Sequence, residues 1–194
     1  MFDYPSIGYN YENVIGRTCI ISEKIDGHNV RAEYMKGKFY KLGSRKVLAA
    51  TYDRVFDDAT QMFYAKYADA LVKILKKVQL SRAIVFGEVY GSKTHMQRIQ
   101  YNEEMAWTFF DIYDIVHKCF LEPIKILKLL EGNVPIPSYR IEHVDRNVIN
   151  EIREDDTPNR EGVVFKPQRI RKPDHTLHYA KAKTKWFMRE INEA

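Results

Sequence analysis

The chain has 194 residues, 45% of them hydrophobic and 13% aromatic, which is enough apolar material to bury the core of one good-sized domain. With 29% charged residues, nine glycines, seven prolines and no biased run, the composition excludes a collagen-like, low-complexity or disordered chain. The formal net charge of +5 suits a polyanionic partner but does not establish one. We expect a single globular domain over residues 1–194, without a C-terminal accessory domain.

The cysteines and the N-terminal segment bear on the compartment of the protein. Cys19 and Cys119 lie in apolar surroundings without a CxxC partner, which excludes a disulfide scaffold and a cysteine-rich zinc site. The N-terminus lacks a basic region followed by an apolar core, and no segment approaches the roughly 20 apolar residues of a membrane-spanning helix. We therefore expect an intracellular, cytoplasmic protein without membrane contact, located in the host cytoplasm if it is viral.

The first half of the chain predicts strands followed by a helix. Short apolar alternation between Thr18 and Ser44 indicates strands, with breaks at Asp26-Gly27 and Lys36-Gly37-Lys38 that are typical of tight turns. Apolar residues then recur at the 3.6-residue period of an amphipathic helix over Ala59–Val78. This part of the chain is therefore expected to form a sheet with a helix against it.

The second half is richer in buried strands. Segments Ala83–Tyr90 and Trp107–Ile115 are dense in β-branched and aromatic residues and predict strands, with a polar loop over Gly91–Glu104 between them. Pro123 and Gly132 bracket a short helix over Glu122–Glu131, because proline suits the first helical position and glycine the position beyond the end. The remaining expected elements are a strand over Tyr139–Val144, a short helix over Asn147–Arg153, a strand over Gly162–Pro167, and a strand and helix from His178.

One lysine stands at a position suited to chemistry. The segment Glu23-Lys24-Ile25-Asp26-Gly27-His28-Asn29 places Lys24 between an apolar strand and a turn. A lysine held there is rigid and partly desolvated, which favours the neutral amine that can act as a nucleophile. Taken alone, a KxDG sequence is more often an ordinary hairpin turn with a solvated lysine.

Further segments of the same chemical character follow in order. Each also has a purely structural explanation, because strand-end carboxylates often form ion pairs, aromatic side chains fill cores and lysines solvate strand faces. The segments are Ser44-Arg45-Lys46, FGEVYG with Glu88, Phe109-Phe110-Asp111, EGVVFKP with Glu161, and Lys181-Ala182-Lys183.

Together and in this order, these segments resemble the motifs of the covalent nucleotidyltransferase superfamily of polynucleotide ligases and mRNA capping enzymes. The resemblance is closest to the nick-sealing RNA ligases of the bacteriophage type, whose EKxxGxN, FGExxG, EGxVxKP and KxK motifs match EKIDGHN, FGEVYG, EGVVFKP and KAK here. DNA ligases usually carry an arginine where this chain has Asn29. The resemblance implies an α/β (α+β) fold, an ATP-grasp-like ligase adenylation domain in which antiparallel sheets flanked by helices enclose a nucleotide groove.

The resemblance implies an ATP-dependent RNA ligase and a role for each charged motif residue. Lys24 attacks the α-phosphorus of ATP to form a lysyl adenylate, the AMP passes to a 5′-phosphate end, and a 3′-hydroxyl then displaces it. Lys181 and Lys183 neutralise the phosphate oxygens, which phosphoryl transfer requires. Glu161 helps to hold a divalent metal ion, Mg²⁺ or Mn²⁺.

The same resemblance assigns the nucleotide contacts. Glu88 engages the ribose, and Arg45 contacts the ribose and the end being joined. Phe110 stacks on adenine, with Phe109 as the alternative, since successive strand residues point to opposite faces. The remaining nucleotide contacts that the resemblance implies are Glu23, Ile25 and Asn29 of the first motif, and Lys166 as a further phosphate contact.

Two other functions stay open at this point, together with the question of the substrate grip. The same chemistry could seal nicked DNA, and the scaffold could serve as a nucleic-acid-binding module without turnover, although binding alone needs no desolvated nucleophile. Ligases of this group continue into a second domain that grips the duplex, so we expect either a minimal one-domain, monomeric ligase or a fragment. The grip on RNA ends or a nicked duplex would come from basic segments such as Lys93–Arg98 and Arg169–Lys172, or from a partner that supplies the missing domain.

Overall fold

The computed structural model describes residues 3–44, 54–91, 99, 104–169 and 177–193. Its strands form a four-stranded sheet in the order β7-β1-β8-β9 and a five-stranded sheet in the order β3-β2-β4-β5-β6, and neighbouring strands are antiparallel throughout. The strands are β1 (Arg17–Glu23), β2 (His28–Met35), β3 (Lys38–Ser44), β4 (Arg82–Tyr90), β5 (Ala106–Asp114), β6 (Cys119–Phe120), β7 (Tyr139–Val144), β8 (Gly162–Pro167) and β9 (Ala180–Lys183).

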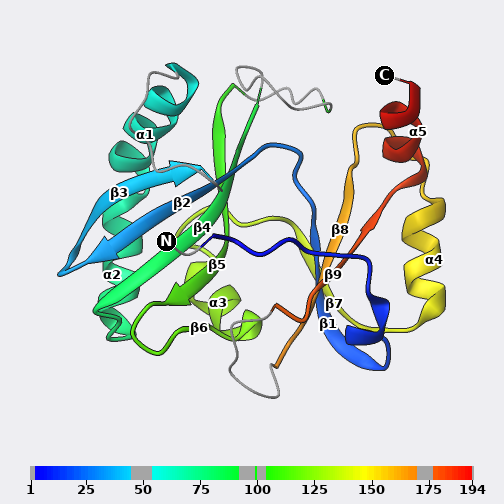
Figure 1. Ribbon diagram of the computed structural model, residues 1–194, viewed down its shortest axis with the longest axis horizontal. Helices are drawn as coiled ribbons and strands as arrows, with labels where there is room; N and C mark the ends of the chain where they lie inside the picture. Colours follow the sequence, from blue (N-terminus) through cyan, green and yellow to red (C-terminus); the bar gives the residue numbers. More distant parts are fainter. Residues whose placement is uncertain (1–2, 45–53, 92–98, 100–103, 170–176, 194) are drawn as a thin grey trace.

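Helices cover the outer faces of the two sheets, and the inner faces of the sheets are turned toward each other (Figure 1). The helices are α1 (Arg54–Lys66), α2 (Ala68–Lys77), α3 (Pro123–Leu130), α4 (Arg146–Glu154) and α5 (Lys185–Glu193), with a 3₁₀ turn over Tyr11–Asn13. Helices α1, α2 and α3 bury the main core against the five-stranded sheet, and α4 buries a second core against the four-stranded sheet. The expected α/β architecture with antiparallel sheets flanked by helices is therefore confirmed.

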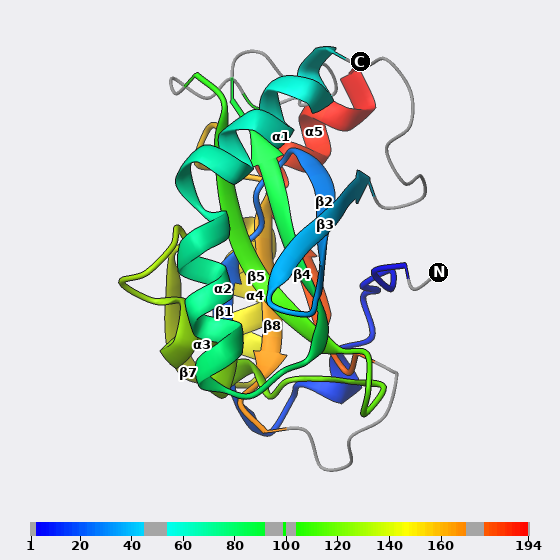
Figure 2. The same cartoon turned by 90° about the vertical axis from the view of Figure 1, so that its left-hand side faces the viewer.

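The prediction of one continuous helix over Ala59–Val78 is wrong. The structure has two helices, α1 and α2, which meet at Tyr67, where φ is −123° instead of helical. The Tyr67 ring packs edge-on against Phe109 of the sheet, with 5.4 Å between ring centroids. The bend lets both helices follow the same core, as Figure 2 shows from the side that α1 and α2 cover. The apolar period continues through the break, so the sequence pattern could not reveal it.

The connection between β1 and β2 also differs from the expected tight hairpin turn. Strand β1 belongs to the four-stranded sheet and β2 to the five-stranded sheet, so the segment from Lys24 to Gly27 crosses from one sheet to the other. The backbone N–H of Lys24 donates to the carbonyl of Gly162 at 2.9 Å, which ties the start of the crossing to β8. At Gly27 a Cβ atom would overlap with the carbonyl oxygen of Val89, so only glycine fits there.

An N-terminal strap, defined here as residues 3–8, spans the two sheets (Figure 1). At one end Asp3 pairs with the fully buried Arg31 of β2 at 2.8 Å. At the other end Gly8 forms a parallel bridge with Ala180, and its carbonyl accepts the backbone N–H of Lys181 at 3.0 Å. No element was predicted for this segment, yet it forms one wall of the site described below.

No helix in the described part of the chain combines the length and the apolar character needed to cross a bilayer. The polar loop expected over Gly91–Glu104 falls largely outside the described residues. The basic segment Lys93–Arg98 lies outside them as well, as does most of the segment Arg169–Lys172.

Candidate active site

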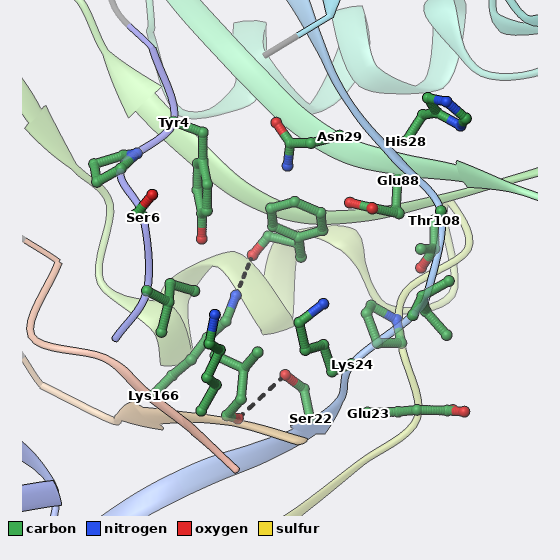
Figure 3. Close-up of a pocket in the computed structure, with 18 of the residues that line it drawn as sticks. Tyr4, Ser6, Ser22, Glu23, Lys24, His28, Asn29, Glu88, Thr108 and Lys166 are labelled. Carbon is green, nitrogen blue, oxygen red and sulfur yellow. Dashed lines mark hydrogen bonds between the residues drawn. The ribbon is translucent and has the colours of Figure 1, made fainter. Parts of the chain in front are cut away.

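A pocket of about 530 Å³ lies between the inner faces of the two sheets. Its lining comes from the crossing segment with Lys24, from β2, β3, β4 and β5 of one sheet, from β1, β8 and β9 of the other, and from the N-terminal strap. Figure 3 shows these side chains converging from all sides on one space. Segments far apart in the sequence thus meet at one site, as the ordered motifs predicted.

Lys24 is partly exposed in this pocket and is held by a buried carboxylate. Its Nζ donates to Oε2 of Glu161 at 2.7 Å, and the side chains of Lys24 and Glu161 are 26% and 4% exposed. The other oxygen of Glu161 lies 3.4 Å from Nζ of Lys183. One carboxylate therefore fixes the position of two lysines, and it leaves Lys24 open on the pocket side.

Strand alternation on β9 explains how the last motif contributes. Lys181 and Lys183 lie two residues apart and share a face of the strand, whereas Ala182 between them is fully buried in the core of α4. Lys181 lines the pocket directly, and its Nζ lies 5.0 Å from the ring centroid of Tyr9. Lys183 stands behind the pocket lining, with its Nζ 4.5 Å from the ring of Phe187.

The aromatic side of the pocket is built on β5. Phe110 lines the pocket, whereas Phe109 is fully buried in the main core, so of these two rings only Phe110 faces the cavity. Beneath Phe110, Nζ of Lys166 donates to the Phe110 carbonyl and to Oδ2 of Asp111, both at 3.0 Å, and lies 5.2 Å from the Phe110 ring. Lys166 lines the pocket as well, but two of its three N–H donors are already used.

The carboxylate that receives Lys166 belongs to a buried polar cluster. Asp111 is fully buried and also accepts hydrogen bonds from Tyr4 at 2.6 Å and from Tyr179 at 3.2 Å. Burial and the charge of Asp111 raise the pKa of both tyrosines well above the usual value, so each hydroxyl stays neutral and donates. The cluster links the strap, β5, β8 and the segment before β9 under the aromatic wall.

A row of polar side chains lies beside Phe110 on the same sheet. Asn29 on β2 is paired in register with Glu88 on β4, and Glu88 is paired with Thr108 on β5. Figure 3 shows Glu88 between the other two. Burial raises the pKa of Glu88 to about 8, and the nearby charge of Glu161 adds to the rise, while Lys24 and the hydrogen bond from Asn29 oppose it.

The remaining expected site residues have different outcomes. Glu23 and Ile25 line the pocket beside Lys24, and Glu23 accepts a hydrogen bond from Ser138 Oγ at 2.7 Å. Arg45 lies outside the described residues. The structure therefore brings together ten of the eleven expected residues, eight in the pocket lining and Glu161 and Lys183 directly behind Lys24.

The donor set at Glu161 fits a divalent metal that keeps most of its water. Among the described residues, no group of three histidine, cysteine, aspartate or glutamate side chains is placed to hold a metal ion by itself. Magnesium is commonly held by one or two carboxylates together with waters and substrate phosphates, and Glu161 can supply one. Since both its oxygens contact lysine ammonium groups, a metal at Glu161 would compete with Lys24 or Lys183.

Comparison with known proteins agrees with this geometry. The model of the RNA ligase family matches residues 17–184, a range that contains all the motif segments. The chain belongs to the RNA ligase family. Comparison with functionally curated proteins finds no match.

Solved structures of ligases share the fold of this RNA ligase family member. A variant of the Naegleria gruberi RNA ligase with ATP and Mn has a TM-score of 0.75 at 14% identity, covering 100% of this chain and 59% of that chain. A second variant, with AMP and Mn, has a TM-score of 0.74 at 16% identity, covering 100% and 60%. An Aquifex aeolicus protein described as an ATP-dependent DNA ligase has a TM-score of 0.69 at 18% identity, covering 96% and 51%. The chain thus spans little more than half the length of these proteins.

Several pocket residues were missed by the sequence reasoning. The strap residues Tyr4, Ser6 and Ile7 carry no motif, and only the folded structure brings them to the pocket. Thr108 could have been found, because it lies two residues before Phe110 on the same strand and must share its face. His28, inside the first motif, also lines the pocket.

Proposed function

We propose that this chain is an ATP-dependent RNA ligase that joins a 5′-phosphate end to a 3′-hydroxyl end through an adenylate on Lys24. The observation that carries the proposal is the position of Lys24, partly exposed in a pocket between two sheets with Glu161 and Lys183 behind it. A binding module has no need for a lysine fixed in this way, whereas a nucleophile must be held in line with its target.

The first step is attack of Lys24 Nζ on the α-phosphorus of ATP. A nitrogen–phosphorus bond forms, the bond from the α-phosphorus to the bridging oxygen breaks and pyrophosphate leaves. The lysine nitrogen gives two of its three ammonium protons to solvent and keeps one in the adenylate. Glu161 accepts a hydrogen bond from the same nitrogen at 2.7 Å, so it orients the amine before attack. Phe110 stacks on the base, which leaves the phosphates beside Lys24 and Lys181.

Charge on the phosphate oxygens must be neutralised as the bond to the leaving group breaks. Lys181 lines the pocket and is a candidate for this role, and Arg45 is expected to add a forked contact. Lys166 uses its Nζ to hold Asp111 and the Phe110 carbonyl, so its main contribution is to fix the stacking ring, with one donor left for phosphate. A divalent Mg²⁺ or Mn²⁺ at Glu161, when bound, supplies Lewis-acid neutralisation of the phosphates.

Two further transfers complete the reaction. A 5′-phosphate oxygen of the RNA attacks the adenylate phosphorus, the nitrogen–phosphorus bond breaks, and Lys24 takes up a proton from solvent and leaves as the amine, which restores its contact with Glu161. The 3′-hydroxyl of the second end then attacks the 5′-phosphorus, loses its proton and releases AMP. Both transfers again use positioned cations and an in-line geometry, so the same pocket residues serve all three steps.

The setting of the reaction follows from the same proposal. We propose RNA ends or a nicked duplex as the substrate, a monomer as the working form and the cytoplasm as the compartment. The chain spans 59% of the Naegleria gruberi enzyme, so a further domain or a partner is proposed to help grip the duplex. The single domain over residues 1–194 is sufficient for the first step, because the described pocket holds the nucleophile and the proposed nucleotide contacts.

The test is a nick-sealing assay with α-labelled ATP and magnesium. Wild-type protein is expected to become labelled, to pass the label to the 5′-phosphate of nicked RNA and to seal it. The Lys24→Ala variant is expected to do none of these, whereas the matched control Lys38→Ala, at an exposed position of β3, should behave as wild type. Labelling of Lys24→Ala at the wild-type level would sink the proposal.

DNA ligation is the second candidate, because the Aquifex aeolicus protein, described as a DNA ligase, shares the fold. Comparing nicks whose 3′-hydroxyl strand is RNA with nicks whose 3′-hydroxyl strand is DNA separates the two. Sealing of the RNA nick in preference to the DNA nick supports the RNA ligase, and the opposite preference supports the DNA ligase.

A further inference from the structure

Three polar side chains form one continuous row on the wall of the pocket. Asn29, Glu88 and Thr108 occupy paired positions on three neighbouring strands, β2, β4 and β5. Side chains at paired positions of antiparallel strands stand on the same face of the sheet. All three line the pocket, as Figure 3 shows, so the row faces the space beside Lys24.

The two ends of this row have unused hydrogen-bonding capacity. Oδ1 of Asn29 and Oγ1 of Thr108 are buried and have no hydrogen-bond partner among the residues that the structure describes. Thr108 is only 3% exposed. An unpaired buried polar atom destabilises the folded state, and folded proteins seldom leave such atoms without a partner. Their position in the wall of a pocket indicates that a ligand supplies the missing partners.

The rest of the pocket limits which part of a nucleotide can reach the row. Phe110 offers the aromatic face on which a base stacks, and Lys24 and Lys181 offer positive charge for phosphates. The row has neither an aromatic face nor a cation. It combines an amide oxygen, a carboxyl group and a hydroxyl, and such groups pair well with hydroxyls that can both donate and accept. The sugar is the part of a nucleotide that carries such hydroxyls.

We propose that Thr108 is a specificity residue that binds a ribose hydroxyl of the nucleotide beside the hydroxyl expected at Glu88, and that it thereby favours ribonucleotides over deoxyribonucleotides. This inference rests on the proposed function, because it assumes that the pocket binds ATP. Thr108 contributes one O–H donor and two acceptor positions, and its neighbour Glu88 receives the adjacent hydroxyl of the vicinal diol. Thr108 therefore contacts the substrate directly and is not a structural support for Phe110.

The test measures nucleotide binding by titration calorimetry without metal, so that binding is separated from adenylate formation. The ligands are ATP, 2′-deoxy-ATP and 3′-deoxy-ATP, and the proteins are wild type, Thr108→Val and Thr108→Ser. Valine has nearly the shape of threonine and suits a strand, so thermal unfolding should show an intact fold. Thr18→Val, at an exposed threonine of β1 outside the pocket lining, is the matched control.

Thr108→Val is expected to bind ATP about tenfold more weakly than wild type, the size of one lost hydrogen bond. One of the two deoxy-ATP analogues should bind Thr108→Val and wild type equally, because the interaction is already missing in that ligand. Thr108→Ser, which keeps the hydroxyl, and Thr18→Val should bind ATP as wild type does.

Two results would overturn the ribose assignment: unchanged ATP binding by Thr108→Val, or an equal loss of binding with ATP and both deoxy analogues. Failure of the proposed ligase function has a different appearance. In that case the binding pattern holds, yet wild-type protein forms no adenylate on Lys24 when magnesium is added. Absence of binding by every nucleotide overturns both.

Discussion

Replacement of Lys166 by methionine is expected to destabilise the fold strongly, because it leaves a buried charge without its partner. Nζ of Lys166 lies 3.0 Å from Oδ2 of Asp111, and the two side chains are 7% and 0% exposed. Two unit charges at this distance attract by about 5.5 kcal/mol at an effective dielectric constant of about 20. Methionine keeps the length and the apolar stem of lysine, so mainly the charge is removed.

The loss is expected to be about 3 to 5 kcal/mol, the range found when one partner of a buried pair is removed. The hydroxyls of Tyr4 and Tyr179 still donate to Asp111, so the carboxylate keeps two hydrogen bonds. Adding Asp111→Asn to Lys166→Met removes the uncompensated charge, and we expect the double variant to recover most of the lost stability.

Urea unfolding at neutral pH, followed by the fluorescence of the buried Trp107, measures these differences. Lys185→Met is the matched control, because Lys185 pairs with Glu154 at 3.9 Å with both side chains largely exposed, and its loss should cost less than about 1 kcal/mol. If Lys166→Met costs no more than Lys185→Met, the pair with Asp111 is hydrated and the reasoning fails.

Three further predictions concern residues in the pocket and the strand behind it. The pKa of Glu88 is raised from 4.5 to about 8 in the folded state, so its contribution to stability falls as pH rises through that interval. The free energy of unfolding of Glu88→Gln relative to wild type should therefore rise by a few kcal/mol when urea unfolding is measured at about pH 8.5 instead of about pH 5. A difference that does not change with pH would contradict the raised pKa. Gly162→Ala should lose more than about 2 kcal/mol in the same assay, because Gly162 has φ of +149° and its Cβ would meet the Ala182 carbonyl, whereas Gly8→Ala, with open space, should be neutral. Phe110→Leu should raise the ATP concentration needed for half-maximal Lys24 labelling about tenfold with little change in stability, and an unchanged ATP dependence would show that the ring does not stack on the base.

Much of the fold could be predicted because its elements carry strong local patterns. The helix α3 begins with Pro123 and is followed by Gly132 at φ +74°, as the bracketing residues predicted. The dense aromatic and β-branched segments became β4 and β5, at the centre of the larger sheet. Such features depend on neighbours in the sequence, so local reasoning is sufficient for them.

The differences lie where distant contacts decide the structure. The break at Tyr67 follows from the packing of its ring on Phe109, which no helical period records. The turn after Lys24 is a crossing between sheets instead of a hairpin, because β1 pairs with β7 and β8 and not with β2. A turn sequence indicates that the chain changes direction, but the partner strands determine which sheet it joins.

The candidate site shows the same division. The ordered motifs mark strands that meet in the fold, so Lys24, Glu161 and the KAK lysines lie at one place. The strap could not be foreseen, since Tyr4 reaches the site through a hydrogen bond to Asp111, 107 residues away. Thr108 differs from the strap, because alternation from Phe110 places it on the pocket face of β5.

The central claim is that Lys24 carries the nucleotide. The most direct measurement is peptide mass spectrometry of the protein after incubation with ATP and magnesium, which locates any AMP adduct on the chain. The account predicts AMP on the peptide that contains Lys24, and none on the peptides that contain Lys181 or Lys183. An adduct on another lysine, or no adduct at all, would contradict it.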